Sequence, residues 1–453
     1  MIIFDLFFSD YILILIGALI IFLAALKVGK KIFIFFAILS LLTMTSTIST
    51  QLRVWVQVIN FLILSYLFFK RYGLEVSRYP RIPNLVVALL SLVFVSMIVS
   101  TTFSNYPVLG IEQIIRMTLF LLLIYFIFAL IESNIEIKTL IFAFIIVGLF
   151  YSITIIVDLA LNNFNLVLME INQLKEENSG YINMNTMGAF FVLIISILMC
   201  LLFGDFKRSI KKIFLFLLII FVLSLLFTNS RAAILSIVIS FLFIFYKLNK
   251  KILKWVLISV IIVIPFYFIS SIQEFVDLYF RLGYHATSGR DFILDVITNV
   301  ITHNPIVGYG PAATKFALYY DLPFMLGSPA EKFIFYHYNE IEFGHAHNFY
   351  LFFWSDLGLL GLFTSLFLPY IYFKLCYKTL QRLREDKNHY FLILGLTAAG
   401  LGLFIRGFFE WSCLISYGTI NTDLPFWIML IMIIYFYNKK EITEKKILTS
   451  NNA

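Results

Sequence analysis

Histidine is concentrated in one polar stretch of an otherwise apolar chain. Residues 271–347 hold five of the six histidines, together with Arg281 and Arg290. The five are His285, His303, His337, His345 and His347. A neutral imidazole is a suitable general base near pH 7, and a guanidinium offers a planar fork for two phosphate oxygens. These residue types indicate proton transfer beside an anionic group.

The strongest local pattern closes this stretch. His347-Asn348 is followed, after nine residues, by Gly358-Leu-Leu-Gly361. Two glycines three positions apart just inside an apolar run allow neighbouring helices to approach closely. We predict that His347 is the general base, that Asn348, Gly358 and Gly361 support it, and that His345 is the second candidate base. The alternative is that the His347 ring is satisfied by local backbone.

Two arginines stand at polar breaks between apolar runs. Arg231 ends a tight turn, 228–231, where a guanidinium is costly without an anionic partner. Arg290 lies in the helix-start pattern of residues 288–291, and an apolar stripe follows at helical spacing until Pro305. We predict an amphipathic surface helix whose first amides and Arg290 bind a phosphate. The alternative is that Arg290 anchors the helix to lipid headgroups.

A metal site is the competing chemistry for the same stretch. The side chains that could bind zinc are His337, Glu340, Glu342, His345 and His347. Their spacing matches no HExxH or other standard zinc pattern, and the three cysteines show no CxxC or pair spacing. No GxSxG elbow or P-loop is present. We predict a site with no metal ion and no cofactor.

The composition is that of a polytopic membrane protein. Hydrophobic residues make up 61% of the 453 residues and charged residues 13%, against about 45–50% and about 25% in soluble domains. The net charge of +8 comes from short basic clusters between apolar runs. This is the arrangement of cytoplasmic loops, so nucleic acid is excluded as a partner.

Apolar segments of about 20 residues can cross a membrane as helices, and the chain has thirteen candidates. They are 11–29, 32–48, 54–69, 84–103, 111–132, 138–161, 186–203, 213–228, 231–247, 253–270, 348–373, 390–410 and 424–437. Some are short, so we predict an all-α polytopic membrane protein with about 12–13 transmembrane helices. A large helical loop is predicted between the tenth and eleventh candidates.

The connections between the candidate spans are alternately rich and poor in lysine and arginine. Connections that would share one face hold 25 of these residues, whereas the alternate connections hold 7. Because cytoplasmic loops are enriched in positive charge, we predict a cytoplasmic C-terminus and a periplasmic histidine-rich loop. The chain then divides into transmembrane helices (1–270), the periplasmic loop with the site residues (271–347), C-terminal transmembrane helices (348–437) and a cytoplasmic tail (438–453).

Six ionisable residues fall inside the candidate spans, each in the outer half of its helix under this orientation. They are Glu112, Arg116, Asp158, Asp356, Arg406 and Glu410. A proton- or ion-coupled transporter would need polar groups near the midplane and a route to both faces. The pattern instead predicts a pocket open to the outer leaflet. The alternative is that each side chain snorkels to the membrane surface.

Four sequence blocks follow one another in the second half of the chain. They are 228–232 (TNSRA), 288–290 (SGR), 304–310 (NPIVGYG) and 347–351 (HNFYL), the last with the Gly358/Gly361 pair. In content and order they resemble the O-antigen ligase/polymerase superfamily of bacterial envelope glycosyltransferases. The first 200 residues match that superfamily only as a hydrophobic array.

The resemblance implies a donor glycan on undecaprenyl pyrophosphate and an inverting transfer without a metal. It implies that His347 deprotonates the acceptor hydroxyl. Arginines would hold the pyrophosphate: Arg231 and Arg290, with Arg281, Arg116 and Arg406. His303 and Tyr309, beside and within the third block, are assigned supporting roles.

Our first hypothesis is a polymerase of O-antigen or another surface polysaccharide, which transfers the glycan to a lipid-linked repeat unit. The alternative is an O-antigen ligase that transfers it to lipid A core or a protein, and a minor alternative is a lipid-linked glycan transporter. The polymerase is preferred because the sequence shows no recognisable core- or protein-docking element. The expected location is the bacterial inner membrane, with the site facing the periplasm. Expected partners are membrane lipids, the lipid-linked oligosaccharide, and a chain-length regulator and a flippase of the same pathway.

Overall fold

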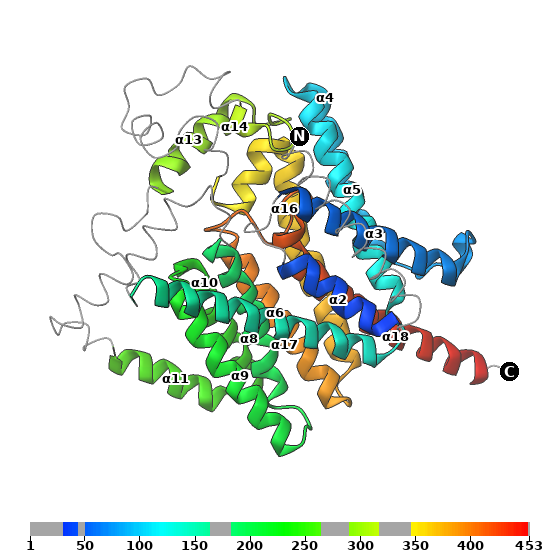
Figure 1. Ribbon diagram of the computed structural model, residues 1–453, viewed down its shortest axis with the longest axis vertical. Helices are drawn as coiled ribbons and strands as arrows, with labels where there is room; N and C mark the ends of the chain where they lie inside the picture. The colour runs from blue at the N-terminus through cyan, green and yellow to red at the C-terminus, as the bar shows by residue number, and fades with distance from the viewer. Residues whose placement is uncertain (1–29, 44–49, 164–182, 264–289, 317–345, 452–453) are drawn as a thin grey trace, which may run out of the picture. The chain divides into compact units, whose positions relative to one another are not determined.

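The computed structural model describes residues 30–43, 50–163, 183–263, 290–316 and 346–451, and all regular structure in these ranges is helical (Figure 1). Ten of the described helices are long and apolar enough to cross a membrane. They are α3 (Thr50–Tyr72), α4 (Asn84–Phe103), α5 (Pro107–Leu130), α6 (Asn134–Leu161), α8 (Met184–Leu201), α9 (Arg208–Phe227), α10 (Arg231–Leu248), α16 (Phe349–Arg382), α17 (Lys387–Arg406) and α18 (Ile420–Asn451). The prediction of an all-α polytopic membrane protein is confirmed.

These ten helices coincide with ten of the thirteen predicted spans. The predicted span 11–29 lies outside the described residues. The spans 32–48 and 253–270 lie partly outside them, and their described parts form α2 (Lys30–Thr43) and α11 (Lys250–Val263). The total of 12 or 13 spans therefore stays a prediction. The remaining described elements are η1 (Val76–Arg78), α13 (Arg290–His303) and α14 (Thr314–Phe316).

The chain forms two compact units. The N-terminal unit comprises residues 1–81 and 119–183, and the C-terminal unit comprises residues 82–118 and 184–453. The boundary falls inside α5, which therefore contributes to both. Every predicted site residue that the structure describes belongs to the C-terminal unit.

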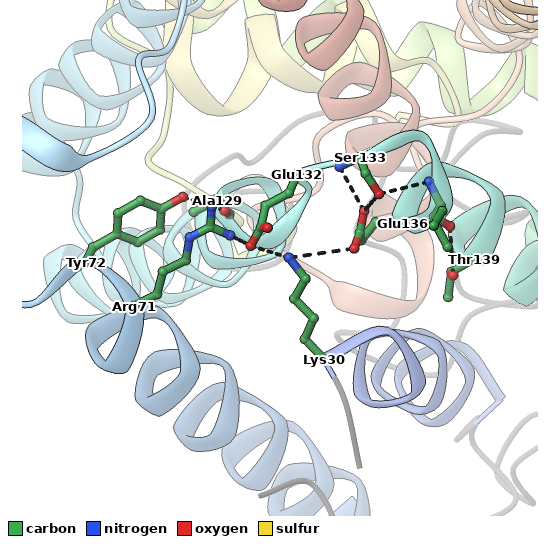
Figure 2. Close-up of polar contacts among 9 residues, drawn as sticks. Lys30, Arg71, Tyr72, Ala129, Glu132, Ser133, Glu136 and Thr139 are labelled. Atoms are coloured by element: carbon green, nitrogen blue, oxygen red, sulfur yellow. Dashed lines mark hydrogen bonds and ion pairs between the residues drawn. The ribbon is translucent and has the colours of Figure 1, made fainter. Parts of the chain in front are cut away.

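Charged side chains at helix ends join α2, α3 and α6 of the N-terminal unit (Figure 2). Lys30, at the start of α2, and Arg71, in the last turn of α3, both form ion pairs with Glu132. Lys30 Nζ also lies 3.6 Å from Oε1 of the buried Glu136. Glu136 accepts the Ser133 amide at 2.8 Å in a capping box that starts α6. One buried carboxylate thus serves a helix start and an inter-helix ion pair.

The C-terminal unit is built around α8, which packs against α9, α10 and α17. Small residues bring these helices close together. A Cβ at Gly395 of α17 would lie 2.9 Å from the Cα of Ile197 in α8. Ser240 of α10 donates its hydroxyl to the Ala398 carbonyl of α17 at 2.8 Å. Close approach and a cross-helix hydrogen bond are typical of helices packed in a membrane.

Around this core, α16 packs against α4, α13, α17 and α18. Its helical path is broken at Gly358, where φ is +65° and ψ is −155°. The helix α17 ends at Arg406, so the predicted span 390–410 extends four residues too far. Residues 407–419, between α17 and α18, form a largely buried connection that we call the 407–419 segment.

Replacing Glu136 with alanine should destabilise the N-terminal unit. The change leaves the Ser133 amide without its acceptor and removes one of the two carboxylates that pair with Lys30, and we expect a loss of about 1–3 kcal/mol. Thermal unfolding in detergent measures it. The matched control is Glu75→Ala, which removes an exposed ion pair with Arg78 worth about 0–1 kcal/mol. Equal unfolding midpoints for the two variants would contradict the role given to Glu136.

Candidate active site

His347 directly precedes Asn348, the N-cap residue of α16, and is held in place by it. The Asn348 side chain accepts the amides of Tyr350 at 2.9 Å and Leu351 at 3.0 Å, and so caps the helix. Its amide group donates to the Phe408 carbonyl at 3.1 Å. His347 itself has φ +44°, which is unusual for a residue with a side chain. The cap and the contact with the 407–419 segment hold His347 in this conformation.

The side chain of His347 faces a buried carboxylate. Its Nδ1 lies 3.4 Å from Oε2 of Glu410, which is 3% exposed. The same Nδ1 is buried and has no hydrogen-bond partner among the described residues. A carboxylate beside Nδ1 favours the proton on that nitrogen and leaves Nε2 to act as the base. His347 is therefore not satisfied by local backbone at Nδ1, which was the alternative to a catalytic role.

Arg406 holds the start of the 407–419 segment. Its guanidinium is 1% exposed and donates from Nη1 to the Ser412 carbonyl at 3.0 Å. Nη2 donates to the Asn185 carbonyl, at the beginning of α8, at 2.9 Å. Nε is buried without a hydrogen-bond partner among the described residues. Arg406 thus joins the ends of α8 and α17 to the segment that carries Glu410.

Arg231 is the first residue of α10 and follows a strained turn. Asn229, with φ +51°, reverses the chain after α9, and Ser230 is the N-cap residue. The Ser230 hydroxyl donates to Oδ1 of Asn185 at 2.8 Å. Because Asn185 also binds Arg406, hydrogen bonds connect the turn before Arg231, through Asn185 and Arg406, to the segment that carries Glu410 beside His347.

Arg116, from α5, binds the other end of the 407–419 segment. Its Nε donates to the Tyr417 carbonyl at 2.8 Å, and Nη2 donates to the Ser416 carbonyl at 3.1 Å and to the Thr419 hydroxyl at 2.6 Å. The buried Asp423 accepts the amide and the hydroxyl of Ser416, each at 2.6 Å. Charged groups from two helices therefore satisfy the backbone of this non-helical connection.

Asp356 of α16 organises the third sequence block. The side chain is fully buried, and its Oδ2 accepts the Ala312 amide and the Tyr417 hydroxyl, each at 2.9 Å. Thr314 donates its hydroxyl to Oδ1. Burial raises the pKa of Tyr417 well above its usual value, so the phenol stays protonated and donates. Asp356 thus connects residues 312–314, the 407–419 segment and α16.

The Gly-Tyr-Gly turn of that block lies on the break in α16. The Gly310 amide donates to the Asp356 carbonyl at 2.8 Å, and the Tyr309 amide donates to the Ser355 carbonyl at 3.1 Å. A Cβ at Gly358 would lie 2.1 Å from the Ile306 carbonyl oxygen. The glycine therefore admits a turn of backbone, whereas the sequence pattern predicted the approach of a neighbouring helix.

The second glycine of the pair has a similar explanation. A Cβ at Gly361 would lie 2.2 Å from the Phe353 carbonyl oxygen, in the part of α16 before the break. Both glycines are needed because the helix bends back on itself, which the spacing alone does not specify.

The amphipathic helix predicted after residue 288 is present as α13. One face is buried, and it consists of Ile293, Val296, Ile297, Val300 and Ile301. Arg290 is its first residue, and only its backbone is described. His303 is exposed at the end of this helix, and its Nδ1 is 2.8 Å from the Asn299 carbonyl of the preceding turn. Within the part of the chain that the structure describes, no hydrogen bond joins His303 to His347.

Several predicted residues lie outside the described residues. They are Arg281 and His345, together with His337, Glu340 and Glu342 of the zinc alternative. Their roles stay predictions.

Sequence reasoning missed Asn185, Tyr417 and Asp423. Asn185 is an ordinary polar residue at a helix start and gave no signal. The run from Glu410 to Asp423 did give a signal. Polar residues interrupt the apolar region there, directly after the predicted span 390–410.

Comparison with known proteins agrees with the four sequence blocks. Residues 216–366 match the family model described as O-antigen ligase. The matched range contains Arg231, the Gly-Tyr-Gly turn and His347 with its glycine pair. No curated protein gives a significant match to the chain.

The break at Gly358 can be tested by substitution. Gly358→Ala combines a positive φ with a steric overlap on the Ile306 carbonyl, and we expect a stability loss of about 3 kcal/mol or more. The matched control is Gly73→Ala, where φ is +63° but no atom lies within 4 Å of the added carbon, with an expected loss of about 1 kcal/mol. Thermal unfolding compares them, and a Gly358 variant as stable as the control would be inconsistent with this close approach.

Proposed function

We propose that this chain, which belongs to the O-antigen ligase/polymerase superfamily through residues 216–366, polymerises a surface polysaccharide. It takes a glycan from undecaprenyl pyrophosphate at the outer leaflet of the bacterial inner membrane. It transfers the glycan to the next lipid-linked repeat unit, with inversion and without a metal ion. A ligase with lipid A core or a protein as acceptor uses the same donor chemistry and is the second candidate.

One observation carries the proposal. His347 faces the buried Glu410 at 3.4 Å. Glu410 lies on the 407–419 segment, which is joined through Arg406 and Asn185 to the turn before Arg231. An oriented base within a network of cationic side chains suits an acceptor hydroxyl and an anionic leaving group.

The reaction is a single displacement at the anomeric carbon. The acceptor hydroxyl gives its proton to Nε2 of His347, and its oxygen forms the new bond to that carbon. The bond from the carbon to the pyrophosphate oxygen breaks with its electron pair. Because attack and departure occur on opposite faces, the configuration inverts. A positioned base contributes about 10²–10⁴-fold to such a step.

Positive charge stabilises the departing pyrophosphate. We assign this role first to Arg231 and Arg290, each at the first position of a helix, and then to Arg281. A helix start adds oriented amides and a partial positive charge. Arg406 and Arg116 carry a second role, because they donate hydrogen bonds to backbone carbonyls in and beside the 407–419 segment. They hold the segment that presents Glu410 and bring positive charge to the same region.

An assay with purified protein and defined lipid-linked repeat units, in the presence of a chelator, tests the function. Lengthening of the lipid-linked glycan supports the polymerase. Transfer only to added lipid A core or protein would overturn the polymerase in favour of the ligase. Loss of all transfer on chelation would contradict the metal-independent step.

Removing the imidazole should remove the base. We expect His347→Ala to lower kcat by about 10²-fold or more, with little change in the unfolding midpoint. The matched control is His389→Ala, whose ring lies 2.5 Å from Asp386 at the start of α17 and has no part in the site. Near-normal turnover by the His347 variant would exclude it as the base.

Glu410 should act through His347. We expect Glu410→Gln to lower kcat by about 10-fold or more, because the amide does not hold the Nδ1 proton or stabilise the imidazolium. The KM for the donor should change little. Glu385→Gln, at an exposed position between α16 and α17, is the matched control. A Glu410 variant with unchanged kcat would show that the carboxylate has no role in the proton transfer.

A further inference from the structure

We propose that Tyr417 is a positioning residue for the pair of His347 and Glu410. Its hydroxyl binds Asp356 of α16 and so holds the 407–419 segment, with Glu410, against that helix. The inference rests on the proposed function, in which His347 is the base, and adds to it a residue that acts through Glu410.

The 407–419 segment is bound to the start of α16 before it reaches Glu410. The Phe349 amide donates to the Gly407 carbonyl at 2.7 Å, and the Asn348 side chain donates to the Phe408 carbonyl at 3.1 Å. These bonds fix where the segment begins. A second attachment, beyond Glu410, is needed to keep the rest of the segment against the helix.

Tyr417 provides that second attachment. Its hydroxyl donates to Oδ2 of Asp356 at 2.9 Å, and both side chains are buried. Its φ of +51° is costly for a residue with a side chain and persists only where the surroundings determine it. Arg116 of α5 supports the same residue, since its Nε donates to the Tyr417 carbonyl at 2.8 Å. Arg116 thus binds the segment to α5, whereas the Tyr417 hydroxyl binds it to α16.

Aromatic packing extends this contact back to Glu410. The centroid of the Tyr417 ring lies 5.4 Å from that of Phe352, a buried residue in the first turn of α16. The Phe352 ring lies 5.1 Å from the ring of Trp411, which directly follows Glu410. The segment is therefore held against α16 both before and after Glu410. The same helix begins beside His347, so it sets the positions of both members of the pair.

Asp356 is a fixed point because other groups bind it as well. Its Oδ2 also accepts the Ala312 amide at 2.9 Å, and Thr314 donates its hydroxyl to Oδ1. Its backbone carbonyl accepts the Ser100 hydroxyl at 2.6 Å. Without the Tyr417 hydroxyl, both carboxylate oxygens keep a donor. The substitution Tyr417→Phe therefore acts on the 407–419 segment rather than on the third sequence block.

The geometry of the pair makes it sensitive to this attachment. Nδ1 of His347 and Oε2 of Glu410 are 3.4 Å apart, which is at the long limit for a hydrogen bond. A further displacement of about 1 Å would end the interaction. The carboxylate would then no longer hold the proton on Nδ1 and leave Nε2 free to act as the base.

Tyr417→Phe removes only the hydroxyl and should lower kcat by about 3- to 10-fold, because Glu410 is positioned less well. The KM for the lipid-linked donor should change by less than about twofold. The matched control is Tyr372→Phe, which removes an equally buried hydroxyl on α16 that donates to the Leu396 carbonyl at 2.6 Å. It should leave kcat unchanged. Equal kcat values for the two variants would overturn the inference.

The decisive measurement is a double-mutant cycle with Glu410. If Tyr417 acts through Glu410, then Tyr417→Phe has no further effect once Glu410→Gln has removed the carboxylate. The double variant should therefore have the kcat of Glu410→Gln alone. A purely structural role predicts that the two losses in kcat multiply, and that result would also overturn the inference.

A readout that needs no turnover separates this inference from the proposed function. In protein labelled with ¹⁵N at histidine, the ring nitrogen shifts report the tautomer of His347, whose signals are those missing from His347→Ala. We expect the proton on Nδ1 in the native protein and in Tyr372→Phe, and a mixture of tautomers in Tyr417→Phe and Glu410→Gln. This pattern without glycosyl transfer supports the positioning role and overturns the function. Transfer by the native protein, with a native tautomer in Tyr417→Phe, overturns the positioning role and supports the function.

Discussion

Buried backbone groups need hydrogen-bond partners, and this requirement shapes the candidate site. The 407–419 segment is non-helical over most of its length yet largely buried. An α-helix would satisfy its own amides and carbonyls, whereas this segment depends on side chains from other elements. Arg406 and Arg116 supply donors to its carbonyls, and Asp423 accepts from Ser416. The charges that are costly in a membrane thus stabilise the non-helical backbone that presents Glu410 to His347.

Strained backbone is concentrated in the same region. Within the described C-terminal unit, the residues other than glycine with positive φ are Asn229, Ala312, His347, Cys413 and Tyr417. Each such residue costs of the order of 1–3 kcal/mol and persists only where its surroundings determine the conformation. All five lie in or next to the four sequence blocks or in the 407–419 segment. This distribution is expected of a preorganised site, since packing interactions elsewhere in the unit offset the strain.

Arginine has two kinds of role in this protein. Arg406 and Arg116 bind carbonyls and so position the segment around the base. Arg231 stands at a helix start whose cap is diverted to Asn185. The guanidinium group therefore supports the fold in one place and, by our proposal, stabilises the departing pyrophosphate in the other. Composition does not separate these roles, because in each case the guanidinium belongs to a helix of mostly apolar residues.

Local pattern in the sequence determined the helices and the identity of the site motifs. Apolar runs predicted ten helices that the structure contains, and the spacing after residue 288 predicted the buried face of α13. Tertiary structure alone decided that Asn185, Ser230 and Arg406 meet, that α17 stops at Arg406, and that Gly358 accommodates the Ile306 carbonyl. Hydropathy and spacing are properties of a short segment, whereas a buried polar group takes its partner from whichever helix packs against it.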